Sequence, residues 1–424
     1  MLGIEKNENW QSRHYYLTVL FVFLMPVYQK AVPIVIVLLL LNTLSLGKGA
    51  FRIPTFRANW SSLALIGFYL WHVLGMLWSS NSDFGWFDLQ IKLSFLLLPW
   101  IYGVAGTMNS DRFRGVMWGF VWGCLAAVFI GVTSSVLSYY SGESPFINLY
   151  DVNISPVLHI GYFAMYLNMG LIAVVYLILR SEDKFYSLRN AGLIGVAFAL
   201  VFAIFLSTSR NGFLSLVVIL LLISIYGIVK FRRWLLGFTL LLLSWIVITT
   251  LAKGWFDRSV TLHGFEQVGE VMATDEVGTD ARESTAVRVL IWRSCWEIIQ
   301  QKPILGTGTG DIKDELMHQY KTHNYIYPYE RQYNAHNQYL QTFAALGIPG
   351  IVLLLLSLSL PFFLGLRQFR FLDLLFSIII STACLTESIL EVQAGVVFFA
   401  FFVAFFSNNS SNISLRSIQK QKEA

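Results

Sequence analysis

The chain has 424 residues, of which 56% are hydrophobic and only 13% carry charge. This composition excludes an ordinary soluble domain, because several apolar runs are long enough to cross about 30 Å of hydrocarbon. The formal net charge of +5 reflects how loops are placed about a membrane, so we expect membrane lipid and no nucleic acid as a partner. The sequence therefore predicts an all-α polytopic membrane protein.

Twelve apolar runs are predicted to be transmembrane helices. The first has no small-residue cleavage site behind it and is interpreted as a retained span, not a signal peptide. In chain order the runs cover residues 15–28, 31–46, 61–79, 90–106, 116–138, 157–179, 191–207, 212–229, 234–252, 348–366, 371–387 and 391–406.

The charges of the connecting segments assign sides to these spans. Basic residues follow spans two, four, six, eight and ten and recur in the tail: Lys48, Arg52, Arg57, Arg112, Arg114, Arg180, Lys184, Arg189, Lys230, Arg232, Arg233, Arg367, Arg370, Arg416, Lys420 and Lys422. The alternate connections carry acids or nothing, and the acids are Asp83, Asp88, Glu143, Asp151, Glu387 and Glu391. Because short cytoplasmic loops collect lysine and arginine, both termini are predicted to be cytoplasmic.

The same assignment divides the chain into four parts. Residues 1–252 hold spans one to nine, and residues 253–347 form one large outer loop. Residues 348–407 hold spans ten to twelve, and residues 408–424 form a cytoplasmic tail.

The outer loop contains most of the polar features of the chain. Residues 284–299 place apolar side chains at helical spacing, which predicts an amphipathic helix able to lie on a membrane surface. Pro303 ends this helix, and a mobile turn is expected over 306–311. The glycines of that turn follow no strand and precede no Lys-Ser/Thr pair, so a turn between two helices is favoured over a nucleotide loop. A short helix over 334–340 should break at 347–350, before an apolar run begins.

Arg210 lies in a Ser-Arg-Asn-Gly turn between spans seven and eight, at the same outer surface. An arginine there is costly in hydrocarbon and breaks the positive-inside rule. It is either a side chain that reaches lipid headgroups or a functional cation, and we favour the cation.

Neither metal nor disulfide chemistry is expected. The three cysteines, Cys124, Cys295 and Cys384, are scattered and form no CxxC motif. His318 and His323 are five residues apart, which places them off a common helical face. The outer acids form no Asp-x-Asp pattern, so we expect a reaction without metal or cofactor.

The order of these motifs resembles the O-antigen ligase and polymerase superfamily. The resemblance rests on Arg210 in its turn, Arg288 followed by Trp292, the Pro-Ile-Leu-Gly-Thr-Gly turn that begins at Pro303, and the His-Asn-Gln-Tyr-Leu segment that begins at His336. It implies an enzyme of the bacterial inner membrane that transfers a glycan from undecaprenyl diphosphate, at the periplasmic face, to lipid A-core or another acceptor. The outer loop would then be a periplasmic catalytic loop, and Arg210, Arg288 and His336 would be the essential residues.

The residues fit that chemistry on independent grounds. A lipid diphosphate leaving group needs cations, and the planar guanidinium binds two phosphate oxygens at once. Arg210 and Arg288 could stabilise the developing charge, while His336 takes the proton from the acceptor hydroxyl. Trp292, Asn337 and Tyr339 are the remaining candidates for substrate binding. A noncatalytic alternative makes His336 an interfacial residue that caps the following helix.

Three functions remain open at this point. A single dominant outer loop favours a ligase over a polymerase, which would hold two carrier-linked glycans. A transporter of lipid-linked glycan should show internal repeats, broken helices or several ionisable groups at mid-membrane, and the sequence shows none. The sequence therefore predicts an inverting glycan ligase.

Overall fold

The computed structural model describes residues 8–51, 59–142, 149, 151–181, 187–231, 285–368 and 370–413. Its elements are helical, with no β-strand among these residues. The helices are α1 (Glu8–Val27), α2 (Val32–Leu44), α3 (Trp60–Gly75), α4 (Ser82–Lys92), α5 (Ser94–Ala105), α6 (Ser110–Tyr140), α7 (Ile160–Leu179), α8 (Leu188–Leu206), α9 (Arg210–Phe231), α12 (Thr285–Gln301), α13 (Ile312–Thr322), α14 (Ile326–Glu330), α15 (Gln338–Gln368), α16 (Phe371–Thr386), α17 (Gln393–Asn408) and α18 (Ser410–Ile413). A short 3-10 helix, η6 (Ile389–Glu391), joins α16 to α17.

Six of the described helical segments are long and apolar enough to cross a membrane: Trp60–Trp78, Ser82–Ala105, Ser110–Tyr140, Ile160–Leu179, Leu188–Leu206 and Gln338–Gln368. Four further apolar helices are shorter. Every predicted span except the ninth overlaps a described helix, whereas 234–252 and the first part of the outer loop lie outside the described residues. The all-helical prediction is therefore confirmed, and the twelve crossings stay a prediction.

The connection expected before the fourth span is itself helical, which corrects the sequence prediction. Asp83 and Asp88 lie on α4, which runs into α5 after a break at Leu93. The Asn81 Oδ1 atom accepts a hydrogen bond from the backbone N–H of Phe84 and so caps the helix. Asp83 then lies in the first turn, where the helix dipole favours a negative charge.

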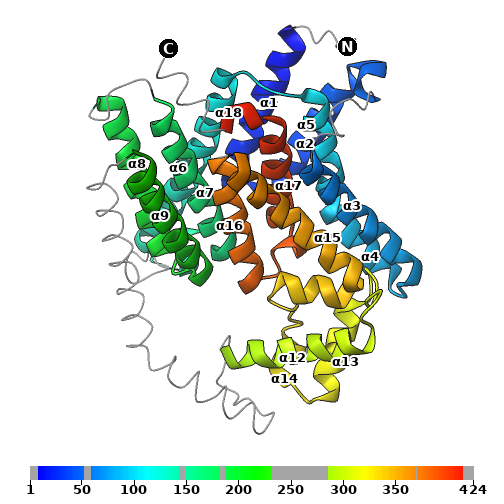
Figure 1. Ribbon diagram of the computed structural model, residues 1–424. Helices are drawn as coiled ribbons and strands as arrows, with labels where there is room; N and C mark the ends of the chain where they lie inside the picture. Colours follow the sequence, from blue (N-terminus) through cyan, green and yellow to red (C-terminus); the bar gives the residue numbers. More distant parts are fainter. Residues whose placement is uncertain are drawn as a thin grey trace.

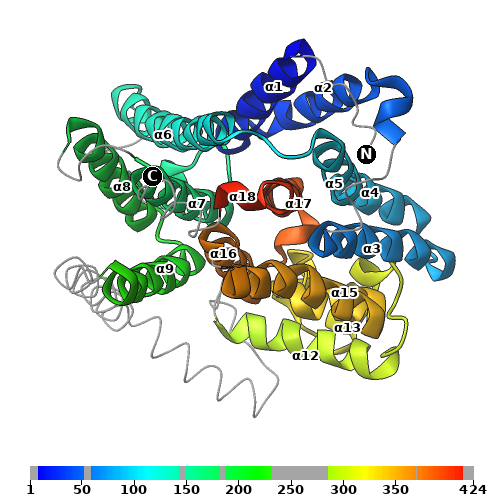
Figure 2. The ribbon, with the colours of Figure 1, turned by 45° about the horizontal axis from the view of Figure 1, so that its top comes forward.

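Helix α17 runs through the centre of the bundle, with the other helices around it (Figure 2). Its residues 394–406 are all buried, as expected of a helix that is apolar on every face. Phe401 packs against Tyr102 of α5 with ring centroids 5.3 Å apart, and Phe405 stacks on Phe113 of α6 at 5.0 Å. The core of the bundle is therefore built from aromatic side chains around one buried helix.

Small residues let α6 approach α1 closely. Gly115, Gly119 and Gly123 recur every four residues along α6 and face α1. A Cβ atom on Gly123 would lie only 2.5 Å from the Phe23 carbonyl oxygen. Such contacts between backbones are typical of helix pairs in membranes.

Helices α12, α13 and α14 lie together beyond one end of the bundle, opposite the end that holds the start of α1 and α18 (Figure 1). The sequence predicts α12 correctly, but its apolar face does not lie on a membrane. Val287, Leu290, Ile291 and Cys295 are each at most 2% exposed, because α13 and α15 cover this face. Packing against α13 and α15 therefore explains the apolar face of α12.

Two glycine turns meet backbone to backbone between α12 and α15. Gly347 interrupts α15 with a φ of +64° and a ψ of −162°, as the predicted break requires. Thr307 donates its N–H to the Ala344 carbonyl at 3.0 Å, and Gly308 donates to Ala345 at 2.8 Å. The turn expected to be mobile is instead hydrogen-bonded to α15, and it anchors the helices that follow α12.

Candidate active site

His336 lies in the segment between α14 and α15, and its backbone is held from several sides. Its N–H donates to the Asn334 Oδ1 atom at 3.0 Å. Trp292 of α12 donates its indole N–H to the Ala335 carbonyl at 3.0 Å, and the Ala335 N–H donates to Gln341 of α15 at 3.1 Å. The φ of His336 is +44°, a left-handed conformation that side chains seldom adopt. These bonds hold the residue in that conformation, and such strain is commonly found at functional sites.

Glu387, in the connection between α16 and η6, bridges His336 and Arg288. Its Oε2 atom lies 2.8 Å from His336 Nδ1, and its Oε1 atom accepts from Arg288 Nη2 at 2.8 Å. The second guanidinium nitrogen of Arg288 donates to the Thr386 carbonyl. Three segments far apart in sequence therefore meet at one carboxylate.

The carboxylate of Glu387 is ionised over the ordinary pH range. Burial acts to raise its pKa, but the hydrogen bond and charge of His336 and the charge of Arg288 outweigh burial and lower the pKa below the usual value. An ionised carboxylate can only accept hydrogen bonds, so His336 carries a proton on Nδ1. In the neutral ring, Nε2 is then free of a proton and can act as a base.

Arg210 begins α9, and its positive charge is close enough to Arg288 for the two to interact. The structure thus brings together the three residues that the sequence singles out: Arg210, Arg288 and His336. The two positive charges repel one another, and the Glu387 carboxylate on Arg288 offsets part of that repulsion. A bound diphosphate would offset more of it.

The other candidates for substrate binding also support the scaffold. Asn337 caps α15, since its Oδ1 atom accepts from the first free N–H groups of that helix, and its Nδ2 atom donates to the Leu385 carbonyl at 3.2 Å. Tyr339 donates its hydroxyl to the Ser381 carbonyl at 3.2 Å. Both side chains tie the His336 segment to α16. The structure therefore gives Asn337 and Tyr339 a positioning role, and Trp292 shares it through its indole N–H.

A second charged group holds the connection that carries Glu387. Glu391 accepts from Lys92 of α4 at 3.0 Å and from the side-chain amide of Gln338 at 3.0 Å. Lys92 also pairs with Asp88, and the Leu390 N–H donates to Gln338 at 2.7 Å. This group crosslinks α4, η6 and α15, so the ionisable side chains of α4 lie beside the candidate site.

Sequence reasoning missed the role of Glu387 and treated it only as an acid in an outer connection. Its position in the sequence could have indicated this role, because Glu387 lies in a short connection between two apolar spans, on the same outer side of the membrane as predicted for His336. The arrangement joins a histidine, a carboxylate and two arginines. Such a set suits transfer of a group from an anionic leaving group to a hydroxyl.

Comparison with family models gives a match at residues 195–355 to the family described as O-Antigen ligase. The matched segment contains Arg210, Arg288, Trp292 and His336. A search of curated proteins gives no match. Together with the six long apolar helices, the match indicates a multi-pass membrane protein. The match agrees with the resemblance found in the motifs: residues 195–355 are similar to the O-Antigen ligase family.

Proposed function

We propose that the chain is an inverting ligase that moves a glycan from undecaprenyl diphosphate to lipid A-core at the periplasmic face of the bacterial inner membrane. The observation that carries the proposal is the bridge from Arg288 through Glu387 to His336, with both distances at 2.8 Å. A base and a phosphate-binding cation are thereby fixed relative to one another.

In the proposed reaction, the acceptor hydroxyl gives its proton to His336 Nε2. The acceptor oxygen forms a bond to the anomeric carbon of the donor sugar while the bond from that carbon to the diphosphate oxygen breaks. Arg210 and Arg288 stabilise the charge of the departing lipid diphosphate. Because the leaving group departs as an ionised diphosphate, it needs no proton from the enzyme.

Glu387 orients the base in this scheme. Its hydrogen bond to Nδ1 fixes the ring and the position of the proton, and it stabilises the imidazolium after proton transfer. The same carboxylate keeps Arg288 in place between substrates. Glu387 is therefore a positioning residue.

Deletion of the gene tests the ligase against the polymerase through the lipopolysaccharide ladder. We expect bare lipid A-core in the outer membrane and long glycan accumulated on its lipid carrier. Wild-type sequence on a plasmid should restore the ladder, and His336→Ala should not, although it is expressed and inserted normally. Cells that still add one repeat to the core would identify a polymerase and contradict the ligase.

A further inference from the structure

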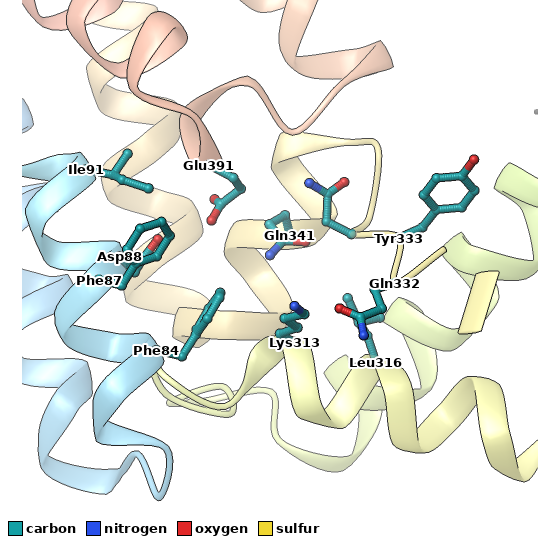
Figure 3. Close-up of a pocket in the computed structure, with 11 residues that line it drawn as sticks. Phe84, Phe87, Asp88, Ile91, Lys313, Leu316, Gln332, Tyr333, Gln341 and Glu391 are labelled. Carbon is teal, nitrogen blue, oxygen red and sulfur yellow. The ribbon is translucent and has the colours of Figure 1, made fainter. Parts of the chain in front are cut away.

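A cavity of about 200 Å³ lies beside the candidate site, between α4, α13 and the segment before His336 (Figure 3). Phe84 and Phe87 of α4 form one wall, with ring centroids 6.4 Å apart. Lys313 lies across from them on α13, and Tyr333 stands at the opposite end from Phe87 (Figure 3). The cavity therefore combines an aromatic wall with polar side chains.

This cavity borders the residues that surround His336. The ring of Tyr333, which bounds the cavity, packs edge-on against the ring of His336 with centroids 5.0 Å apart. Glu391, at another edge of the cavity, lies in the same short connection as Glu387. A molecule bound there would contact Tyr333, and the ring of Tyr333 packs against that of the proposed base, His336.

The chemistry of the walls selects a sugar. One face of a pyranose ring presents C–H groups that pack on aromatic rings, while its hydroxyls need hydrogen-bond partners at the edge. Phe84 and Phe87 supply the apolar surface, and Lys313, Gln332 and Gln341 supply polar atoms (Figure 3). A lipid tail would leave these polar groups without partners. The volume is below the about 300–1,000 Å³ of sites for drug-sized ligands, which suits one ring and not a chain of sugars.

We infer that this cavity binds the sugar ring of the acceptor that carries the attacking hydroxyl, an inference that rests on the function proposed above. Inversion requires the acceptor to attack from the side opposite the leaving diphosphate. Arg210 and Arg288, at the starts of α9 and α12, hold the diphosphate in that proposal. The cavity is lined instead by α4, α13 and the segment before His336, which leaves it for the acceptor.

The variant Phe87→Ala tests this assignment, with Trp86→Ala as a matched control. Both side chains lie on α4 and are similarly exposed, at 57% and 61%, but only Phe87 lines the cavity. Full-length protein in liposomes is supplied with lipid-linked glycan and with lipid A-core from cells that lack the gene. We expect Phe87→Ala to raise the KM for lipid A-core about tenfold, with the donor KM and kcat within about twofold. Lys313→Ala should act in the same direction, and Trp86→Ala should match wild type.

Two kinetic outcomes would overturn the inference. A rise in the donor KM alone would assign the cavity to the donor sugar, and unchanged constants in both cavity variants would show that it binds neither. If wild-type protein transfers no glycan, the proposed function fails and calorimetry with delipidated core oligosaccharide decides about the cavity. Binding to wild type that is weakened in Phe87→Ala would support the inference, whereas equal binding or none would refute it.

Discussion

Replacement of Glu387 by glutamine removes one negative charge from the site and leaves the size of the side chain unchanged. The carboxylate now serves two donors, His336 Nδ1 and Arg288 Nη2. The single amide oxygen of glutamine can serve only one of them, and the amide nitrogen is itself a donor. We therefore expect Glu387→Gln to fold and insert normally but to misorient the base.

The loss can be sized from the geometry. A hydrogen bond to a charged group contributes about 1.5–3 kcal/mol, and about 1.4 kcal/mol in a barrier corresponds to a factor of ten in rate. The His336 and Glu387 side chains keep 26% and 24% of their surface exposed, so water weakens the bond. We expect kcat to fall by about 10- to 50-fold, with the donor KM changed less because Arg288 stays charged.

The assay is glycan transfer by purified protein in liposomes, with kcat and both KM values measured separately. Glu330→Gln is the matched control, since it makes the same change at an exposed glutamate on α14. Activity of Glu387→Gln within twofold of wild type would refute the orienting role of Glu387. A rise confined to the donor KM would show that the carboxylate acts only through Arg288.

The pH dependence of stability provides a second readout on the same pair of proteins. Because the folded pKa of Glu387 is below its usual value of about 4.3, the carboxylate stabilises the fold above that pH and the contribution is lost as pH falls through the folded pKa. The difference in Tm between wild type and Glu387→Gln should therefore be constant near neutral pH and shrink below about pH 4. A difference in Tm that already shrinks as the pH falls from 8 to 6 would contradict the lowered pKa of Glu387.

Four further predictions follow from the fold and the site. Arg210→Lys and Arg288→Lys should each reduce transfer about tenfold or more, because an ammonium cannot bind two phosphate oxygens in the guanidinium geometry; near-normal kcat/KM would contradict this. Gly347→Ala should lower Tm in detergent, since its φ and ψ are confined to glycine and a Cβ would lie 2.1 Å from the Ile304 carbonyl oxygen; an unchanged Tm would contradict this. A cysteine at Gln332 should react with an impermeant thiol reagent applied from outside, whereas one at Arg112 should not. Chelation of divalent ions should leave transfer unchanged, and loss of activity restored by added metal would contradict a reaction without metal.

Local sequence patterns predict the helices well, because each depends on the residues within it. The stripe from Val287 to Ile299 predicts α12, and the glycine at 347 predicts the break in α15. The same patterns cannot tell what covers an apolar face. The stripe of α12 is consistent with a lipid surface or a protein core, and only the packing of α13 and α15 decides for the core.

The site could be predicted only residue by residue. Arg210 is recognisable as a cation at a costly position. Arg288 and His336 are singled out by the family resemblance, and their side chains suit phosphate binding and proton transfer. Arg288 and His336 meet at Glu387 through contacts that span 99 and 51 positions of the sequence, and no local pattern encodes such contacts. The sugar cavity likewise forms only where α4, α13 and the segment before His336 come together.

Glycan transfer by the purified chain alone is the most direct test of the central claim. Liposomes containing the protein, undecaprenyl diphosphate-linked glycan and lipid A-core should yield glycan joined to lipid A-core and free undecaprenyl diphosphate in equal amounts. The new linkage should have the anomeric configuration opposite to that of the donor, and His336→Ala should form no product. Retention of configuration, or full activity of His336→Ala, would contradict the account.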